Sequence, residues 1–371
     1  MWQYDICIVG AGLSGATIAR LAAEDSKKVL IIDKREHIGG NVYDSIDDIS
    51  KIRISKYGAH IFHTNDEGVW NFINRFGSWK RWDHHVVSDI SGIYIPMPIT
   101  ITTINTLFNL SLIDEKEMID WLSKEVLLCD SPTNSEEVAL SKVGSRLYEA
   151  LFKSYTKKQW DKEPRELDPS VLERIPVRTN FDTRYFTDKF QALPEHGYTS
   201  IVKSMLDHPN ITLKLNTPWS EDLKRSWKAL VFTGPIDVYF KNSGLPELEY
   251  RSIEFKWSRF YQPGFHQPCA VVNYPSLDVP YTRCVEYKHF LNQRGPWSMI
   301  AYETTCAEGE PYYPVPTKKN KDLYEKYRLL AKNEKDVHFV GRLASYKYFN
   351  MDQAIRNAID YYPILHQNRD T

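Results

Sequence analysis

Cysteine is scarce in this sequence of 371 residues, and its few copies form none of the usual patterns. The five cysteines are odd in number, and neither a CxxC pair nor the Cys/His spacing of a zinc site is present. We therefore expect neither a disulfide-stapled domain nor a bound metal, and buried thiols in a reducing compartment. The five are Cys7, Cys129, Cys269, Cys284 and Cys306.

Long apolar runs, a targeting signal and an excess of one charge are also missing. No apolar stretch approaches the about 20 residues of a membrane span. The first strand-like run starts at Tyr4 without the basic flank of a signal peptide. The formal net charge is −1, and no basic stripe suited to nucleic acid is visible. We expect a cytoplasmic protein that binds neither nucleic acid nor a membrane.

What remains is an ordinary globular composition with many aromatic residues. Hydrophobic residues make up 42% and charged residues 26% of the chain, and its length exceeds what one core usually holds. Two or more lobes around a shared cleft are therefore expected. The 10 Trp and 23 Tyr residues fit either a site that stacks planar groups or a packed aromatic core.

A nucleotide-binding fingerprint stands near the start of the chain. Residues 4–9 form a strand-like run, Gly10-Ala11-Gly12-Leu13-Ser14-Gly15 matches GxGxxG, and residues 13–23 have helical character. The glycines allow a tight turn, close approach of a pyrophosphate and close helix packing. Asp33 ends a second strand about 20 residues later, where a carboxylate hydrogen-bonds a ribose. The pattern predicts a dinucleotide-binding βαβ unit rather than a merely structural turn.

Two further stretches favour FAD over a nicotinamide. The segment from Asp33 to Asn41, which contains Gly39-Gly40, resembles the extended fingerprint of FAD proteins of the glutathione-reductase and amine-oxidase type. A late strand ends at Gly341-Arg342, and Asn350 with Gln353 predicts the capped start of an amphipathic helix. In the resembling proteins the positive end of such a helix points at the flavin. An ordinary capped surface helix is the alternative.

The pattern along the chain predicts an α/β fold with a discontinuous Rossmann-like domain, a helical lobe and an antiparallel β-sheet domain. The strand-like runs at 229–233 and 337–340 return to the first domain. The predicted boundaries are 1–85, 199–241 and 320–371 for the FAD-binding domain, 100–165 for the helical lobe, and 86–99, 175–198 and 245–315 for the antiparallel sheet and substrate domain.

Several motifs in one order give the sequence a resemblance that covers nearly its whole length. They are the segments 56–64 (KYGAHIFHT), 155–160 (YTKKQW), 174–178 (RIPVR), 233–237 (TGPID), 280–283 (PYTR), 311–315 (PYYPV), 341–344 (GRLA) and 346–353 (YKYFNMDQ). The chain closely resembles the bacterial type of UDP-galactopyranose mutase. It departs from that pattern at Asp161 and His196, where glycine is expected. The first departure concerns the nucleotide pocket or its loop.

The resemblance implies an isomerase that interconverts UDP-galactopyranose and UDP-galactofuranose with reduced FAD and no net redox change. The implied path is attack of flavin N5 on the anomeric carbon, loss of UDP, opening and reclosure of the sugar ring, and return of UDP. Its catalytic residues would be Arg174 and Arg283, which hold the diphosphate, and His63, which lies against the flavin. Arg174 stands between Pro164 and Pro176 on a segment expected to close over the substrate.

The resemblance also assigns binding residues and partners. The cofactor would be held by Gly10, Gly12, Leu13, Ser14, Gly15, Asp33, Lys34, Gly40, Asn41, His60, Ile61, Arg342, Tyr348, Met351 and Asp352. The substrate would be held by Phe152, Tyr155, Thr156, Trp160, Arg174, Tyr185, Asn273, Arg283, Tyr313 and Tyr348. The partners would be UDP-galactose in both ring forms, an external electron donor and a second copy of the chain. Whether the sugar carries a 2-acetamido group stays open.

Two other functions share the fingerprint. A flavin oxidoreductase of the amine-oxidase class would pass hydride to oxygen, although paired arginines among tyrosines suit a diphosphate better than an amine. A non-catalytic binding protein of the same fold would perform no chemistry, although the intact glycines and Asp33 favour a retained cofactor.

Overall fold

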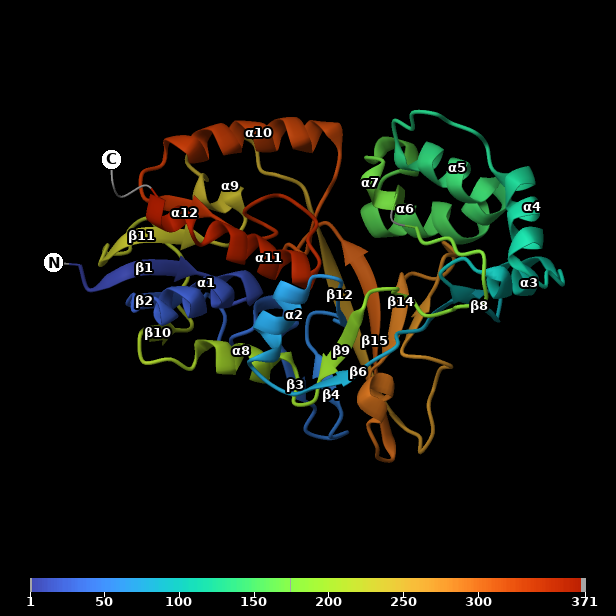
Figure 1. Ribbon diagram of the computed structural model, residues 1–371, viewed down its shortest axis with the longest axis horizontal. Helices are drawn as coiled ribbons and strands as arrows, with labels where there is room; N and C mark the ends of the chain where they lie inside the picture. The colour runs from blue at the N-terminus through green and yellow to red at the C-terminus, as the bar shows by residue number, and fades with distance from the viewer. Residues whose placement is uncertain (1, 174, 368–371) are drawn as a thin grey trace.

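The protein, seen here as a computed structural model, is described for residues 2–173 and 175–367. The parallel sheet and its helices lie at one end of the molecule, and the helical lobe lies at the other (Figure 1). A second large sheet lies next to the helical lobe. Within the described residues, no helix is long and apolar enough to cross a membrane.

The parallel sheet has five strands in the order β10-β2-β1-β11-β17. These are β1 (Tyr4–Val9), β2 (Val29–Ile32), β10 (Ile211–Lys214), β11 (Trp227–Phe232) and β17 (Val337–Phe339). The central strands are short runs of buried branched residues, as a parallel sheet covered on both faces requires. The predicted strand, helix and strand at the start of the chain and the two later returns are confirmed.

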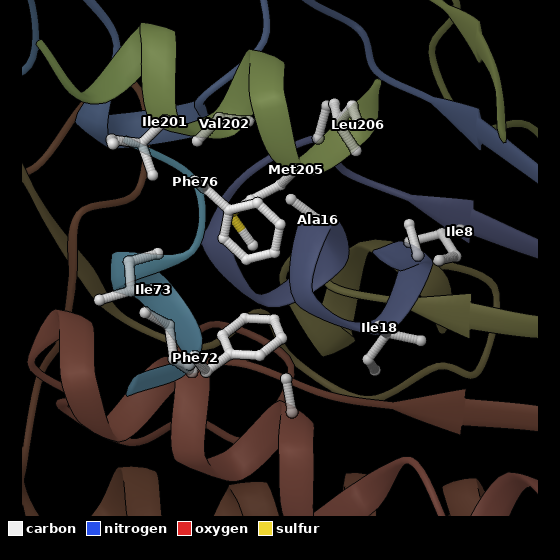
Figure 2. Packing of buried hydrophobic residues seen from close by; sticks show 14 of the residues in the cluster. Ile8, Ala16, Ile18, Phe72, Ile73, Phe76, Ile201, Val202, Met205 and Leu206 are labelled. Atoms are coloured by element: carbon white, nitrogen blue, oxygen red, sulfur yellow. The ribbon is translucent and has the colours of Figure 1, made fainter. Parts of the chain in front are cut away.

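Helices close one face of this sheet. They are α1 (Leu13–Glu24), α2 (Glu67–Asn74), α8 (Tyr198–Leu206) and α11 (Met351–Tyr361). Figure 2 shows Phe76, just after α2, next to Ala16 of α1 and Met205 of α8, and Phe72 of α2 on the side of Ile18. On the opposite face, Trp219 stacks on the ring of Tyr239 in α9 (Ile236–Tyr239) with centroids 5.8 Å apart. The central strands of the sheet are therefore buried on both sides, whereas the edge strand β10 is largely exposed. The helix α10 (Lys318–Asn333) packs beside β17.

The helical lobe is the predicted run of helices. It contains α3 (Ile101–Phe108), α4 (Glu115–Glu125), α5 (Ser135–Leu147), a π-helical stretch (Tyr148–Lys153), α6 (Ser154–Trp160), a short turn (Pro164–Glu166) and α7 (Ser170–Glu173). Gly144 interrupts α5 with a φ of +76°, and a Cβ there would lie 2.2 Å from the carbonyl oxygen of Glu125. Only glycine fits this close approach of α5 to the end of α4.

The second large sheet has seven strands in the order β16-β12-β15-β14-β13-β7-β8. These are β7 (Val86–Ile90), β8 (Ile93–Met97), β12 (Tyr250–Tyr261), β13 (Val271–Asn273), β14 (Arg283–Glu286), β15 (Trp297–Cys306) and β16 (Tyr313–Pro314). All neighbouring strands of this sheet are antiparallel except β13 and β7, which pair in parallel. The mixed α/β fold class is confirmed, with this one parallel pair in the second sheet.

Two small sheets complete the fold. The hairpin of β3 (Asp44–Ile46) and β4 (Arg53–Ser55) forms one, and β5 (Phe62–Thr64), β9 (Phe190–Pro194) and β6 (Trp79–Arg81) form the other in the order β5-β9-β6. The sequence grouped residues 175–198 with the antiparallel sheet, but β9 pairs with strands of the first segment instead. The division into three domains otherwise stays a prediction.

Candidate functional site

The glycine-rich turn after β1 leaves no room for side chains at two positions. Gly10 has a φ of +108°, and a Cβ there would lie 2.1 Å from Oγ1 of Thr233. A Cβ on Gly15 would lie 2.0 Å from the carbonyl oxygen of Gly10. The turn therefore needs glycine at both positions, and it opens α1 with Gly12 as the N-cap residue.

The carboxylate of Asp33 braces this turn from the end of β2. Its Oδ2 accepts a hydrogen bond from the backbone N–H of Ala11 at 2.8 Å, and Oδ1 accepts from the N–H of Arg35 at 2.9 Å. Gly12 and Gly40 face each other so closely that a Cβ on Gly40 would lie 3.0 Å from the Cα of Gly12. The result is a bare backbone cradle at a helix N-terminus, which fits a dinucleotide pyrophosphate.

Lys34 and Asn41 beside this cradle already have protein partners. The ammonium of Lys34 lies 2.7 Å from Oε1 of Glu310, and Oδ1 of Asn41 accepts a hydrogen bond from Arg35 at 3.0 Å. The structure therefore places Leu13, Ser14, Lys34 and Asn41 around the turn, and their predicted contacts with a cofactor stay predictions.

A cavity of about 520 Å³ lies where the three parts of the fold meet. Its volume suits a small-molecule ligand. Most of the predicted site residues line it: His60, Ile61, His63, Phe152, Tyr155, Thr156, Trp160, Tyr185, Asn273, Arg283, Tyr313, Arg342, Tyr348 and Met351. The sequence therefore identified most of one surface from motifs spread over nearly 300 residues. Arg174 lies outside the described residues, while its neighbours Leu172 and Ile175 line the cavity.

Asp352 is a predicted cofactor residue that does not line this cavity. It stands in the first turn of α11, where its Oδ2 accepts a hydrogen bond from Oγ1 of Thr64 at 2.9 Å. Its Oδ1 is buried and has no hydrogen-bond partner among the described residues. The N-cap pair predicted for this helix is present, because the N–H of Asn350 donates to Oε1 of Gln353 at 2.9 Å.

Arg283 is held in the cavity by a buried carboxylate. Its Nε donates to Oε2 of Glu303 at 2.5 Å, and Glu303, on the neighbouring strand, is only 1% exposed. Burial by itself lowers the pKa of Arg283, but the charge and hydrogen bond of Glu303, together with Tyr155 and Tyr313, outweigh it and raise the pKa well above the ordinary value. The guanidinium is therefore a fixed positive charge. Asn273 lies opposite Arg283 in the β13–β14 pair.

Aromatic side chains form the walls around this charge. The rings of Tyr313 and Tyr348 stack with centroids 5.3 Å apart, and Trp160 meets Tyr313 edge-on at 6.3 Å. The guanidinium of Arg342 lies 5.0 Å from the ring centroid of Tyr348. Burial raises the pKa of Tyr313 to about 12 and raises that of Tyr155 further, although the charge of Arg283 opposes both shifts. Both phenols are therefore neutral hydrogen-bond donors near pH 7.

Two histidines of the cavity, the buried His84 and the partly buried His60, are neutral. Burial lowers the pKa of His60 to about 4 and that of His84 to about 3. Nδ1 of His60 lies 2.8 Å from the carbonyl oxygen of Gly58, so this nitrogen carries the proton. Nδ1 of His84 accepts from the indole N–H of Trp82 at 3.4 Å, so the proton of His84 is on Nε2. Two uncharged imidazoles of opposite tautomer thus face one cavity.

His63, the predicted catalytic histidine, is on β5 and pairs with an acid. Its Nδ1 lies 3.1 Å from Oδ2 of Asp188, and its ring stacks on Phe186 with centroids 3.7 Å apart. Phe186 also lies near-parallel to His84, at 6.0 Å. His63 therefore sits in a stack of aromatic rings with one nitrogen bound to a carboxylate.

The departure at Asp161 has a local reason. Asp161 ends α6 in the left-handed region, with a φ of 55° and a ψ of 36°. Glycine is the residue that adopts this conformation at least cost, and aspartate is among the few others that tolerate it. Its carboxylate lies 3.7 Å from the guanidinium of Arg251. The backbone after Trp160 can therefore adopt with Asp161 the same left-handed conformation that glycine would adopt. The other departure, His196, is exposed in a turn.

The comparisons with known proteins agree with this geometry. The family described as UDP-galactopyranose mutase matches residues 150–348, and a NAD(P)-binding Rossmann-like domain matches residues 8–76. A protein of Klebsiella pneumoniae named "Probable UDP-galactopyranose mutase" is 40% identical over 359 residues, which cover 96% of this chain and 93% of the relative. The chain belongs to the UDP-galactopyranose mutase family. The enzyme class, an isomerase, and the recognition from the motifs are thereby confirmed.

Family membership leaves the sugar nucleotide open. A dTDP-fucopyranose mutase of Escherichia coli is also 40% identical, over 366 residues that cover 96% of each chain. A crystal structure of reduced UDP-galactopyranose mutase superposes with a TM-score of 0.76 at 15% identity, covering 98% of this chain and 93% of that one. This structural similarity supports the fold. The Rossmann-like dinucleotide-binding domain of the sequence analysis is confirmed.

Several residues of the site were not predicted from the sequence. His84, Phe186 and Gln159 line the cavity, and Glu303 and Asp188 lie directly behind it. The His84-His85 pair and the acidic residue within an apolar strand at Glu303 were the available signals. Neither signal is strong, because both patterns are common on solvated surfaces.

Proposed function

We propose that this protein binds FAD on the glycine-rich turn and, with the flavin reduced, interconverts UDP-galactopyranose and UDP-galactofuranose in the cavity. The observation that carries the proposal is the fixed charge of Arg283 between neutral phenols. A guanidinium whose Nε is held by Glu303 at 2.5 Å presents its remaining N–H groups in one direction. That arrangement suits a diphosphate, which bears negative charge both as part of the substrate and as a leaving group.

The fit of the turn to FAD rests on the cradle of Gly10, Gly12 and Gly40, which side chains would fill. Asp33 keeps lone pairs for a ribose hydroxyl, because each carboxylate oxygen accepts more than one hydrogen bond. The orphaned Oδ1 of Asp352 is a buried acceptor at the start of α11 that the cofactor would satisfy. Reduced flavin supplies a nucleophilic nitrogen for the anomeric carbon when it is bound.

The chain's own residues bind, orient and exclude water. Arg283 stabilises the charge that develops on the diphosphate as the bond to the sugar breaks. Tyr185, Tyr313 and Tyr348 donate hydroxyl hydrogen bonds to the phosphates. Phe152, Tyr155, Thr156, Trp160 and Asn273 hold the uridine end. His60 and His63 lie on the cofactor side with Ile61, Arg342 and Met351.

The segment that carries Arg174 closes the cavity. Its flanks support this role, because Leu172, Ile175 and Pro176 line the cavity and Pro164 begins a short helical turn before them. Arg174 would then add a second cation to the diphosphate from the closing side. The cytoplasmic location, the second copy of the chain and the external electron donor stay predictions.

The test is a cofactor analysis followed by a substrate comparison. The extracted cofactor is expected to be FAD, and the dithionite-reduced protein is expected to act on UDP-galactofuranose with the highest kcat/KM. Parallel anaerobic assays use dTDP-fucofuranose and the 2-acetamido form of UDP-galactofuranose. A higher kcat/KM for either of these would replace the proposed substrate but keep the mutase. A colourless protein without affinity for UDP would contradict the whole proposal.

A further inference from the structure

His63 and Asp188 form a histidine–carboxylate pair at the edge of the cavity. His63 is the middle residue of β5, and Asp188 lies just before β9, the antiparallel partner of β5. The Nδ1–Oδ2 distance is 3.1 Å, and the two side chains are 15% and 21% exposed. The contact is therefore direct, well shielded and built on a paired backbone.

Asp188 is itself held in place by its neighbours. The amide nitrogen of Asn65 donates to its other carboxylate oxygen at 3.3 Å, and Oδ1 of Asn65 accepts from the N–H of Lys189 at 2.8 Å. The side-chain amide of Gln191, which is 2% exposed, donates to the Asp188 carbonyl oxygen at 2.8 Å. These contacts fix both the backbone and the carboxylate, so Asp188 offers His63 an acceptor in one position.

The ring of His63 is fixed by stacking as well. Phe186 lies against it with ring centroids 3.7 Å apart and planes inclined by only 14°. Nε2 of His63 has no hydrogen-bond partner among the described residues, whereas the ring lines the cavity. The nitrogen remote from Asp188 is thus the one left for a ligand.

We propose that Asp188 is a positioning residue that keeps a proton on Nδ1 of His63, so that Nε2 presents its lone pair to the cavity in the uncharged form of the imidazole. A carboxylate can only accept, which forces the facing nitrogen to donate. His63 then meets the reduced flavin or a sugar hydroxyl as a hydrogen-bond acceptor. This inference rests on the proposed function for what His63 meets, but its tautomer is a property of the chain alone.

The first test is the tautomer itself. Two-bond ¹H–¹⁵N correlation spectra of the ¹⁵N-histidine-labelled holoprotein, taken at about pH 8.5 where an ordinary imidazole is neutral, distinguish a protonated from an unprotonated ring nitrogen. The His63 signal is assigned by its loss in His63→Gln. Protonated Nδ1 with unprotonated Nε2 is expected. The opposite tautomer in the unaltered protein would overturn the inference without any variant of Asp188.

The second test separates the carboxylate from mere packing. Asp188→Leu keeps the number and branching of the side-chain heavy atoms but removes the acceptor, so Nε2 of His63 is expected to become largely protonated. Asp188→Asn keeps an acceptor oxygen, so the tautomer of His63 in this variant is expected to stay nearer to that of the unaltered protein. Asp83→Asn, which removes an exposed carboxylate near β6, is the matched control and leaves the spectrum unchanged. An unshifted tautomer in Asp188→Leu would overturn the inference.

Kinetics distinguish failure of the inference from failure of the proposed function. In an active mutase, Asp188→Leu is expected to lower kcat about 10-fold with KM nearly unchanged, which is part of the about 100-fold typical of a positioned proton-transfer group. If the tautomer is as expected but no UDP-sugar reacts, the proposed function is wrong, while the inference that Asp188 positions His63 still holds. If the sugar reacts and kcat is unaffected, the role of Asp188 is wrong and the function remains.

Discussion

The Nε of Arg283 donates to Oε2 of Glu303 at 2.5 Å across the β14–β15 pair, and no other side-chain hydrogen bond of Arg283 occurs among the described residues. The side chain of Glu303 is 1% exposed, whereas that of Arg283 is 28% exposed. One partner is thus anchored in the sheet and the other reaches the cavity. This relationship fixes where positive charge is offered to a ligand.

Replacing Arg283 with lysine is expected to weaken UDP binding by about 10- to 100-fold, the equivalent of one charged hydrogen bond of about 1.5–3 kcal/mol. A single ammonium cannot replace a fork that serves Glu303 with Nε and the diphosphate with its other N–H groups. Isothermal titration with UDP measures the change. Arg294→Lys, at an exposed position, is the control and should bind UDP normally. Unchanged affinity in Arg283→Lys would refute the assigned role.

Acid is expected to destabilise the protein through its buried histidines. The folded pKa of His84 is lowered to about 3 from the ordinary 6.5 by burial, aided by the charges of His85 and Arg283. Between these values the unfolded chain binds a proton that the folded protein does not, so the free energy of unfolding falls as the pH falls. One such group contributes a slope of about 1.4 kcal/mol per pH unit.

Urea unfolding of His84→Asn at several pH values between 6.5 and 4 tests this assignment. The slope of stability against pH should decrease by roughly one proton relative to the unaltered protein, whatever the variant's stability at pH 7. His196→Asn, an exposed histidine, should keep the full slope. Parallel curves for His84→Asn and the unaltered protein would show that His84 is not buried in its neutral form.

Gly10→Ala is expected to abolish retention of the dinucleotide. Its Cβ would lie 2.1 Å from Oγ1 of Thr233 at a φ of +108°, so both sterics and backbone strain oppose the turn. The ratio of flavin to protein absorbance after gel filtration reports retention. Gly244→Ala is the matched control, since it shares a positive φ of +79° but meets no atom within 4 Å. A fully loaded Gly10→Ala protein would contradict the assignment of the turn.

Lys158 ties the helical lobe to the connection between β13 and β14. Its ammonium shares three N–H donors among four carbonyl oxygens, those of Ser276, Val279 and Tyr281 at 2.7, 3.0 and 2.9 Å and that of Tyr274. Lys158→Met is expected to raise KM for the UDP-sugar about 10-fold, because the connection between Asn273 and Arg283 loses all of these hydrogen bonds; this change corresponds to about one charged hydrogen bond of binding free energy. Hydrogen exchange of residues 275–281 should accelerate.

Lys157→Met is the matched control, because the neighbouring lysine pairs with Glu163 on the surface. It should leave both KM and the exchange of the connection unchanged. If Lys158→Met behaves like this control, the connection is held by its own backbone and Lys158 has no part in positioning Asn273 and Arg283.

The sequence predicted those features that rest on local patterns. The turn at Gly10 requires glycine for steric reasons that act within a few residues, and its strand and helix follow directly from periodicity. The pairing of β9 with β5 and β6 was mispredicted, because a strand's partner is chosen by contacts far along the chain. Alternation along a strand does not tell which face a second sheet or a cavity covers.

The two acids behind the cavity, Glu303 and Asp188, could not be predicted from the sequence either, because their roles also depend on contacts far along the chain. Glu303 lies in a strand where a solvent-facing glutamate would look identical, and only its pairing with Arg283 across the sheet reveals its function. Asp188 stands in an irregular segment and becomes informative through its 3.1 Å contact with His63. Most of the residues that line the cavity could thus be predicted from motifs, but the acids that position them could not.

The most direct test of the account counts turnovers per reduced flavin. The protein is reduced with one equivalent of dithionite, freed of excess reductant under anaerobic conditions, and given a large excess of UDP-galactofuranose, while absorbance follows the flavin and chromatography follows the sugar. A mutase predicts many molecules of UDP-galactopyranose per flavin with the flavin still reduced. One equivalent of a reduced sugar product in place of UDP-galactopyranose, with the flavin reoxidised, would contradict the account and favour an oxidoreductase.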